Sequence, residues 1–570
     1  MISKLKIIDS AIKKLARIEP RFFYFLVVIN VIPLLSSQFF LTVDGPAHVY
    51  NSNLIVELFW NADSPLLNYF KFNDTLAPNW TGHLILSTLI TFLPGFIAEK
   101  FVLLFYVVGL PLSARYLFKS LGINNRYIIY LIFPFTYSYL FYYGFFNFNI
   151  GVVLFLYGIG LWVKSRKQRT ISNFFKLSLI SGFICLSHLF VFALFLLTIF
   201  ILNLEDLILF FKGDKNDRIE LIKTYLFQLI CLPLGIAVMV LFLFSDSPFE
   251  ATTSYLSLKD LFISLKYIMP AKGVNYNEYG SIVKPLLYVF TGLILWNVAT
   301  NIYLLISKRK IFINHKTWLL ILLSTFFLIF LLPDRIGAGG FISARLLLFF
   351  FIFLIIWLAA QPAPNWIKTI VFITANIVNV LVIFHNYNAQ SDNNQISGDM
   401  IAITRHIEDY SVILPITYSE NFMLTHISNY AGAEKPLIIL ENYEASANQF
   451  PLTWNLKSIP SLKFGNKGPN NCISWPTPTM SKIDQAIDYV CVIADKTTKK
   501  DDPCYKQIQN ILDSHYNLVA STSENRIKLY KIILPLTAYK IYMLRTQSFT
   551  CGTLAENTNK SQFTNYKNNK

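Results

Sequence analysis

Charged residues are scarce in this 570-residue sequence, at 14% against 54% hydrophobic residues. A soluble globular protein carries about 25% charged residues, so much of this surface must face something other than water. Cysteine (6 residues) and glycine (23) are too rare for a disulfide-framework or a collagen-like fold. The 51 phenylalanines and 31 tyrosines exclude intrinsic disorder. The composition indicates a polytopic membrane protein.

The sequence also lacks the fingerprints of soluble enzymes and of common metal sites. It contains no Walker loop, no GxGxxG after a strand, no GxSxG and no HExxH. It has no CxxC pair and no histidine–cysteine spacing of the kind that holds zinc. We therefore expect no metal ligands, and polar groups at the membrane surface remain as candidate functional residues.

The net charge of +16 does not indicate a nucleic-acid partner. Many basic residues lie in short loops between apolar runs, such as Lys164–Arg169 and Lys308–Lys310. A nucleic-acid footprint would gather them on one folded face, whereas basic short loops are typical of the cytoplasmic side of a membrane protein. The sequence predicts contact with a lipid bilayer and no contact with nucleic acid.

Apolar runs and loop charges together predict eleven membrane spans after a basic cytoplasmic N-terminus at residues 1–21. The apolar run 84–93 is too short to cross, so we interpret residues 84–97 as an interfacial helix within a first external loop, 44–98. This assignment of spans places the basic loops on the cytoplasmic side. We expect the multi-pass protein to lie in a bacterial inner membrane. The expected spans are 22–41, 100–118, 126–142, 148–163, 174–188, 189–205, 224–245, 282–306, 317–333, 345–360 and 367–385.

The composition changes after residue 385. Short β-rich runs at 412–416, 489–494 and 526–533, with helical patterns near 398–409 and 504–514, predict an α/β or α+β domain at 386–556. The odd number of spans places this domain outside the cytoplasm. The expected fold is thus mostly α, a transmembrane bundle at 22–385 followed by the extracytoplasmic domain and a disordered tail, 557–570. Three disulfide pairings are open to the four cysteines of this region, Cys472, Cys491, Cys504 and Cys551.

The first candidate site is Asp44-Gly45-Pro46-Ala47-His48, directly after the first span. A carboxylate on an external turn can take a proton from an acceptor hydroxyl as a general base. His48, four residues on, lies within reach of it if the segment is helical. The alternative is that Asp44 only caps the following helix.

Further candidates lie at the expected external boundary. His83, Asn147 and His188 are polar groups at the ends of apolar runs, where such groups are costly and often functional. Arg335 and Arg345 flank a glycine-rich turn and have the fork that binds phosphate oxygens. Alternatively, His188 fills a helix turn, Arg335 pairs with Asp334 and Arg345 extends to the lipid headgroups.

Several of these segments resemble the GT-C superfamily of polytopic membrane glycosyltransferases over residues 20–390. The similarity lies in the basic N-terminus, the first span ending at Asp44, the helix 84–97, the turn Leu112–Gly122, and Phe133–Phe135 leading to Gly144–Phe148. The resemblance implies a polyprenyl-phosphate-linked sugar as donor and a catalytic role for Asp44. Because residues 142–149 contain no carboxylate, we do not expect a divalent metal cofactor.

The favoured interpretation is inverting transfer of a sugar, on the outer face of the membrane, to a cell-surface glycan, lipid or protein acceptor. Asp44 and His48 would be catalytic, and His83, Asn147, His188, Arg335 and Arg345 would bind substrate. Two alternatives stay open: a non-catalytic transporter or export factor for surface polysaccharide, and another lipid-linked transfer, of phosphoethanolamine or acyl groups.

Overall fold

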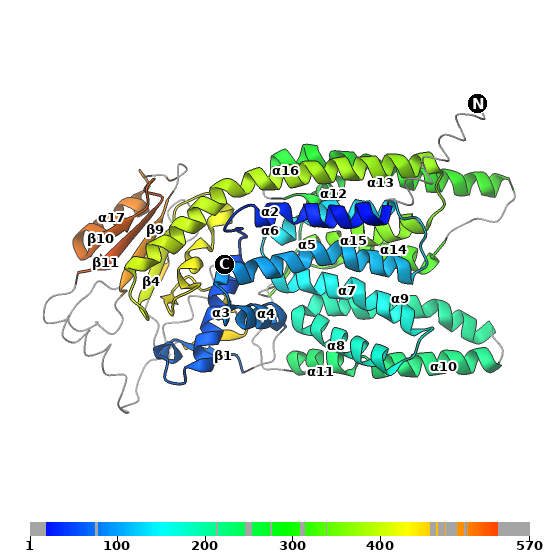
Figure 1. The fold of residues 1–570 in the computed structure, drawn as a ribbon, viewed down its shortest axis with the longest axis horizontal. Helices are drawn as coiled ribbons and strands as arrows, with labels where there is room; N and C mark the ends of the chain where they lie inside the picture. The colour runs from blue at the N-terminus through cyan, green and yellow to red at the C-terminus, as the bar shows by residue number, and fades with distance from the viewer. Residues whose placement is uncertain are drawn as a thin grey trace.

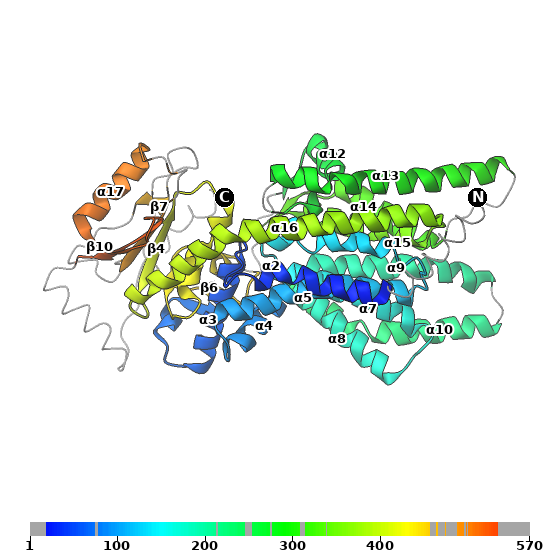
Figure 2. The ribbon, with the colours of Figure 1, turned by 45° about the horizontal axis from the view of Figure 1, so that its top comes forward.

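The computed structural model describes residues 19–533, except 75–77, 213–214, 245–252, 274–275, 308–313, 338, 448, 456–462, 465–472, 475–486, 495–497 and 499. Most of the expected N-terminal segment, the tail 557–570, Cys472 and Cys551 lie outside these residues. Figures 1 and 2 show a bundle of long helices with a mixed α and β region at one end.

Six helices in the described part of the chain are long and apolar enough to cross a membrane. A seventh span is added if the bent pair α10 (Lys215–Ile230) and α11 (Pro233–Leu243) counts as one. The six lie in α5 (Gly95–Ser120), α7 (Phe146–Ser165), α9 (Leu189–Lys212), α13 (Tyr276–Ile306), α15 (Ile342–Ala360) and α16 (Asn365–Ile403).

Several other expected spans correspond to shorter apolar elements. The span 174–188 corresponds to α8 (Ile171–Ser187) and the span 317–333 to α14 (Lys316–Leu331). The first span is a helix over residues 19–30 that continues as α2 (Ile32–Leu35). The span 126–142 differs from a regular α-helix: it consists of a 3-10 helix, η2 (Ile128–Phe135), and the short α6 (Tyr139–Tyr142). Pro134 lies inside η2 and has no backbone N–H to donate.

Residues 44–98, the expected first external loop, form two helices. They are α3 (Gly45–Trp60) and α4 (Trp80–Ile90), so the helix expected at 84–97 ends early and α5 begins at Gly95. Between them, β1 (Phe70–Phe72) pairs antiparallel with β6 (Leu452–Trp454) of the C-terminal region. The rings of Phe70 and Trp454 stack 4.5 Å apart. This pairing joins the segment between α3 and α4 to the C-terminal domain.

The C-terminal domain contains a mixed five-stranded sheet of order β10-β11-β9-β4-β5. β4 runs parallel to β5 and β9, while β11 is antiparallel to β9 and β10. The expected runs 412–416, 489–494 and 526–533 are strands of this sheet, and the helical pattern 504–514 is α17. The bounds are β4 (Val412–Thr417), β5 (Ile438–Ile439), β9 (Tyr489–Ile493), α17 (Pro503–His515), β10 (Tyr516–Ser521) and β11 (Ile527–Ile532).

The long helix α16 joins the two parts. It runs along the bundle and reaches the sheet region, while α3 and α4 lie between the bundle and the sheet (Figure 1). Among the domain's cysteines, Cys491 is free and buried, and Cys504 is disulfide-bonded. The remaining short elements are η1 (Pro65–Asn68), β2 (Thr253–Ser254), α12 (Leu258–Lys266), η3 (Met269–Ala271), β3 (Arg335–Ile336), η4 (Thr404–His406), η5 (Phe422–Leu424), η6 (Ile427–Gly432), η7 (Glu444–Ser446), β7 (Lys463–Phe464) and β8 (Ile473–Ser474).

Candidate functional site

Asp44 directly precedes α3, and its backbone is held by the turn that precedes α7. Its N–H donates to the carbonyl of Tyr143 at 3.0 Å. The absence of a side chain at Gly144 permits this close approach. A Cβ there would lie 2.9 Å from the nitrogen of Asp44 and 2.8 Å from that of Gly45. Pro46 supplies the fixed φ that favours the first turn of a helix. The Asp-Gly-Pro sequence thus places the Asp44 carboxylate at the start of α3.

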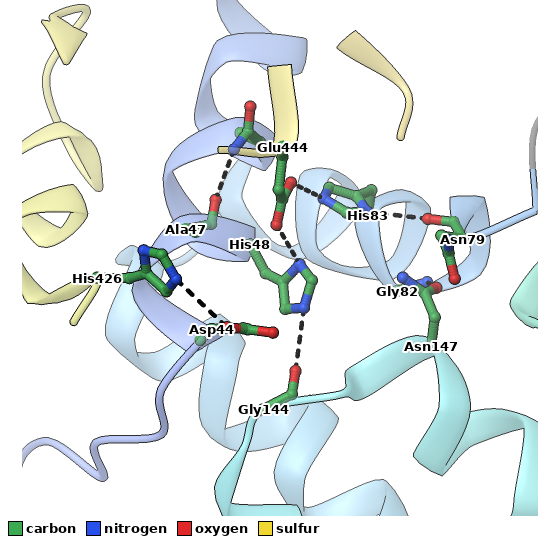
Figure 3. A network of polar contacts seen from close by, with 12 residues as sticks. Asp44, Ala47, His48, Asn79, Gly82, His83, Gly144, Asn147, His426 and Glu444 are labelled. Atoms are coloured by element: carbon green, nitrogen blue, oxygen red, sulfur yellow. Dashed lines mark hydrogen bonds and ion pairs between the residues drawn. The ribbon is translucent and has the colours of Figure 1, made fainter. Parts of the chain in front are cut away.

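The side chain of Asp44 makes no capping hydrogen bond to α3, so the structure does not support the capping alternative. Its side chain is 14% exposed, and it faces His426, whose Nε2 lies 3.7 Å from Oδ1 (Figure 3). Burial raises the pKa of Asp44 above its ordinary value, although His426 and His48 each lower it. A carboxylate with a raised pKa that solvent can reach is suited to accept a proton.

His426 is held from its other side by Glu441. The Nδ1 atom of His426 contacts Oε1 of Glu441, and its ring packs on Tyr443 at a centroid distance of 4.5 Å. Ser428 also donates to Glu441, at 3.2 Å. The order Glu441–His426–Asp44 orients the imidazole toward the carboxylate.

His48 and His83 meet at a carboxylate from the C-terminal domain, Glu444 (Figure 3). Nδ1 of His48 lies 2.6 Å from Oε1, and Nε2 of His83 lies 2.8 Å from Oε2. The three side chains are at most 5% exposed. Burial alone would raise the pKa of Glu444, but the two imidazoles outweigh it and hold the pKa at about 2. Burial lowers the pKa of His48, but Glu444, Asp44 and the carbonyl of Gly144 together raise it above its ordinary value.

Arg345 and His188 lie beside each other at the bundle end of the site. The guanidinium of Arg345 packs over the rings of Phe145 and Phe148, at 4.9 and 5.5 Å, and interacts electrostatically with Asp44. His188 interacts electrostatically with Arg345 and packs against Phe148. Nε of Arg345 and Nδ1 of His188 are buried without a hydrogen-bond partner.

The other two predicted residues have different surroundings. Oδ1 of Asn147 accepts a hydrogen bond from the backbone N–H of Gly82 at 2.6 Å, which ties α7 to α4. Arg335 is exposed on β3 near Gly340, and no ion pair joins it to Asp334 among the described residues. The structure thus gathers Asp44, His48 and His83 with Asn147 nearby, and leaves Arg335 at the edge.

The sequence-based prediction missed the residues that the C-terminal domain contributes, above all Glu444, Glu441 and His426. Glu444 and His83 are separated by 361 residues, so no local spacing links them. A signal for them would have had to come from the fold itself, through the pairing of β1 with β6.

Two solved structures of one other protein are similar to this chain. They are ArnT from Cupriavidus metallidurans bound to undecaprenyl phosphate (10% identity, TM-score 0.51, covering 90% of this chain and 98% of that chain) and in the apo state (10%, 0.47, 89% and 97%). The likeness to the first shows a common fold, a helical membrane bundle followed by a C-terminal domain, as expected from the sequence. No protein-family model matches the chain, and no curated protein matches its sequence.

Proposed function

We propose that this protein transfers a sugar from a polyprenyl-phosphate-linked donor to a cell-surface glycan, lipid or protein acceptor on the extracytoplasmic face of the membrane. The observation that carries the proposal is the Asp44 carboxylate, which begins α3 without capping it and stays partly exposed. The fold supports it, since the ArnT structure of the same architecture contains undecaprenyl phosphate.

In the proposed reaction, Asp44 accepts the proton of the acceptor hydroxyl. The acceptor oxygen attacks the anomeric carbon of the donor as the bond from that carbon to the phosphate oxygen breaks. The bonding pair leaves with the polyprenyl phosphate, and the configuration inverts. His48, one helical turn after Asp44, and His426 keep the carboxylate in place.

The polyprenyl phosphate group is assigned to the bundle side of the site. Arg345 offers a guanidinium nitrogen, and His188 a ring nitrogen, that have no protein hydrogen-bond partner. Donors preorganised beside a departing phosphate stabilise the charge that develops on it. Arg335 borders the same turn from the exposed side, where a charged ligand can enter. We assign acceptor binding to the C-terminal domain that lies over the site. His83 and Asn147 are buried beneath it and bonded to Glu444 and Gly82, so they would position the acceptor site without touching the acceptor.

The proposal is tested by mass spectrometry of surface glycans from strains that lack the gene. The strains are restored with wild-type protein, Asp44→Asn, or Asp63→Asn, at matched protein levels. Asp63 is exposed in the loop after α3, so it controls for loss of an aspartate. Removal of a general base costs about 100- to 10,000-fold in rate, so Asp44→Asn should leave one sugar missing that the other two proteins restore.

Equal restoration by all three proteins would exclude Asp44 as the general base. The non-catalytic interpretation, a transporter or export factor for surface polysaccharide, would then be favoured.

A further inference from the structure

The cluster of His48, His83 and Glu444 has the composition of a metal site. The three residues come from α3, α4 and η7, and their facing nitrogen and oxygen atoms all lie within 4.8 Å of one another. Two imidazole nitrogens and a carboxylate oxygen form a frequent ligand set for zinc, which binds them at about 2.0–2.2 Å. The atoms are close enough for small side-chain movements to bring all three to one ion.

The outer nitrogen of each imidazole is already engaged. Nε2 of His48 lies 3.0 Å from the carbonyl oxygen of Gly144, and Nδ1 of His83 lies 3.1 Å from that of Asn79. A carbonyl only accepts hydrogen bonds, so each outer nitrogen carries a proton. In a neutral ring the inner nitrogen then has a free lone pair, and a backbone carbonyl behind each ring is the usual second shell of a metal-binding histidine.

Of the two inner contacts, the one between Nε2 of His83 and Oε2 of Glu444 is a hydrogen bond at 2.8 Å. Nδ1 of His48 and Oε1 of Glu444 are 2.6 Å apart, yet both are buried without an aligned hydrogen-bond partner. A shared proton requires donor and acceptor to be aligned. An ion beside the line that joins the two atoms can instead bind both. Nearby rings keep the site apolar, with Phe146 4.9 Å from His48 and Phe450 5.9 Å from His83.

We propose that His48, His83 and Glu444 bind a divalent transition-metal ion, with Zn²⁺ as the best match to two imidazoles and one carboxylate. The ion would join α3, α4 and η7, and so fix the C-terminal domain onto the first external loop. Because His48 lies one helical turn after Asp44, the ion would also hold the start of α3 in position. This role does not depend on which reaction the protein catalyses.

The test measures bound metal in the full-length protein, purified in detergent with a tag that contains no histidine. Wild type, Glu444→Gln, His83→Gln and the control His406→Gln are stripped with chelator and incubated with Zn²⁺, then with Co²⁺ in a separate sample. His406 is an exposed histidine of η4. The readouts are metal content by elemental mass spectrometry, the visible absorption of bound Co²⁺, and the melting temperature with and without Zn²⁺.

We expect wild type and His406→Gln to bind about one ion per chain and to melt at a higher temperature with Zn²⁺. Glu444→Gln and His83→Gln should bind the ion more weakly by more than the roughly 10- to 100-fold that outer-shell changes cost. If stripped wild type takes up no stoichiometric ion, or if the ligand variants bind it like wild type, the proposal is wrong.

Two features keep the test decisive. The stripped and reloaded wild type is compared with itself, so the result for wild type still stands if a ligand variant fails to fold. Metal content is measured without an activity assay, so failure of the metal site and failure of the proposed transfer reaction are told apart.

Discussion

Gly144 sets how closely the turn before α7 approaches Asp44, and replacing it with alanine tests whether that placement matters. Its φ is +78°, and an added Cβ would lie 2.8 Å from the nitrogen of Gly45 and 2.9 Å from that of Asp44. Non-bonded contacts are favourable at about 3.5–4.0 Å, so the backbone must separate by roughly half an ångström or more. A displacement near 1 Å costs about 100-fold in rate. We expect Gly144→Ala to lose roughly 10- to 100-fold of activity.

Gly122 provides a matched control for backbone strain. It has a φ of +70°, but a Cβ there would meet nothing within 4 Å. A left-handed conformation costs an alanine roughly 1–2 kcal/mol, so both variants share that loss of stability. Only Gly144→Ala also forces the backbone of Asp44 to move.

The two variants are compared by rate of sugar transfer in membranes with matched protein amounts and by thermal unfolding of the purified protein. We expect Gly122→Ala to be somewhat less stable but to transfer sugar at the wild-type rate. Equal rates for the two variants would refute the argument that close packing of Gly144 against Asp44 sets the geometry of the site.

Three other substitutions have defined expectations. Asn147→Leu removes the acceptor for the buried N–H of Gly82, which should cost about 1–3 kcal/mol of unfolding free energy, measured by thermal unfolding. His426→Gln should lower kcat about tenfold with little change in KM if this residue positions the general base, one factor of ten being about 1.4 kcal/mol; an unchanged kcat would remove it from the site. Arg345→Lys should raise the KM for the lipid-linked donor more than Arg335→Lys does, because only the first side chain is half-buried beside the other site residues.

The part of the site that the sequence could predict is the part encoded locally. Asp44 and His48 are four residues apart, and Gly45-Pro46 indicates a turn that enters a helix, so their common position followed from spacing alone. In the structure Asp44 lies immediately before α3, and His48 lies in the first turn of that helix. Glu444 could not be predicted in this way, because it reaches the same place through the pairing of β1 with β6.

In the membrane segments, too, the sequence predicted some features and not others. Long apolar runs such as 148–163 and 345–360 predict helices because only a helix satisfies its own backbone in lipid, and the structure has α7 and α15 there. Apolar content does not distinguish an α-helix from a 3-10 helix, so the form of residues 128–135 could not be predicted. The bend of 48° between α10 and α11 occurs at Pro233, where helix hydrogen bonding is interrupted.

Residue type alone did not predict which of the two arginines faces the site. Arg335 and Arg345 flank one glycine-rich turn and both can bind phosphate. The chain places Arg345 on the buried face of α15 against Phe145 and Phe148, whereas Arg335 faces outward on β3. Which of the two points inward depends on the helix that follows the turn.

The most direct test of the central claim is to count both products of the reaction. Membranes containing wild-type protein or Asp44→Asn are supplied with the polyprenyl-phosphate-linked form of the sugar identified by glycan mass spectrometry. We predict that wild type forms the glycosylated acceptor and free polyprenyl phosphate in equal amounts, and that Asp44→Asn forms neither above about one hundredth of that level. Glycosylated acceptor without matching release of polyprenyl phosphate, or full product from Asp44→Asn, would contradict the account.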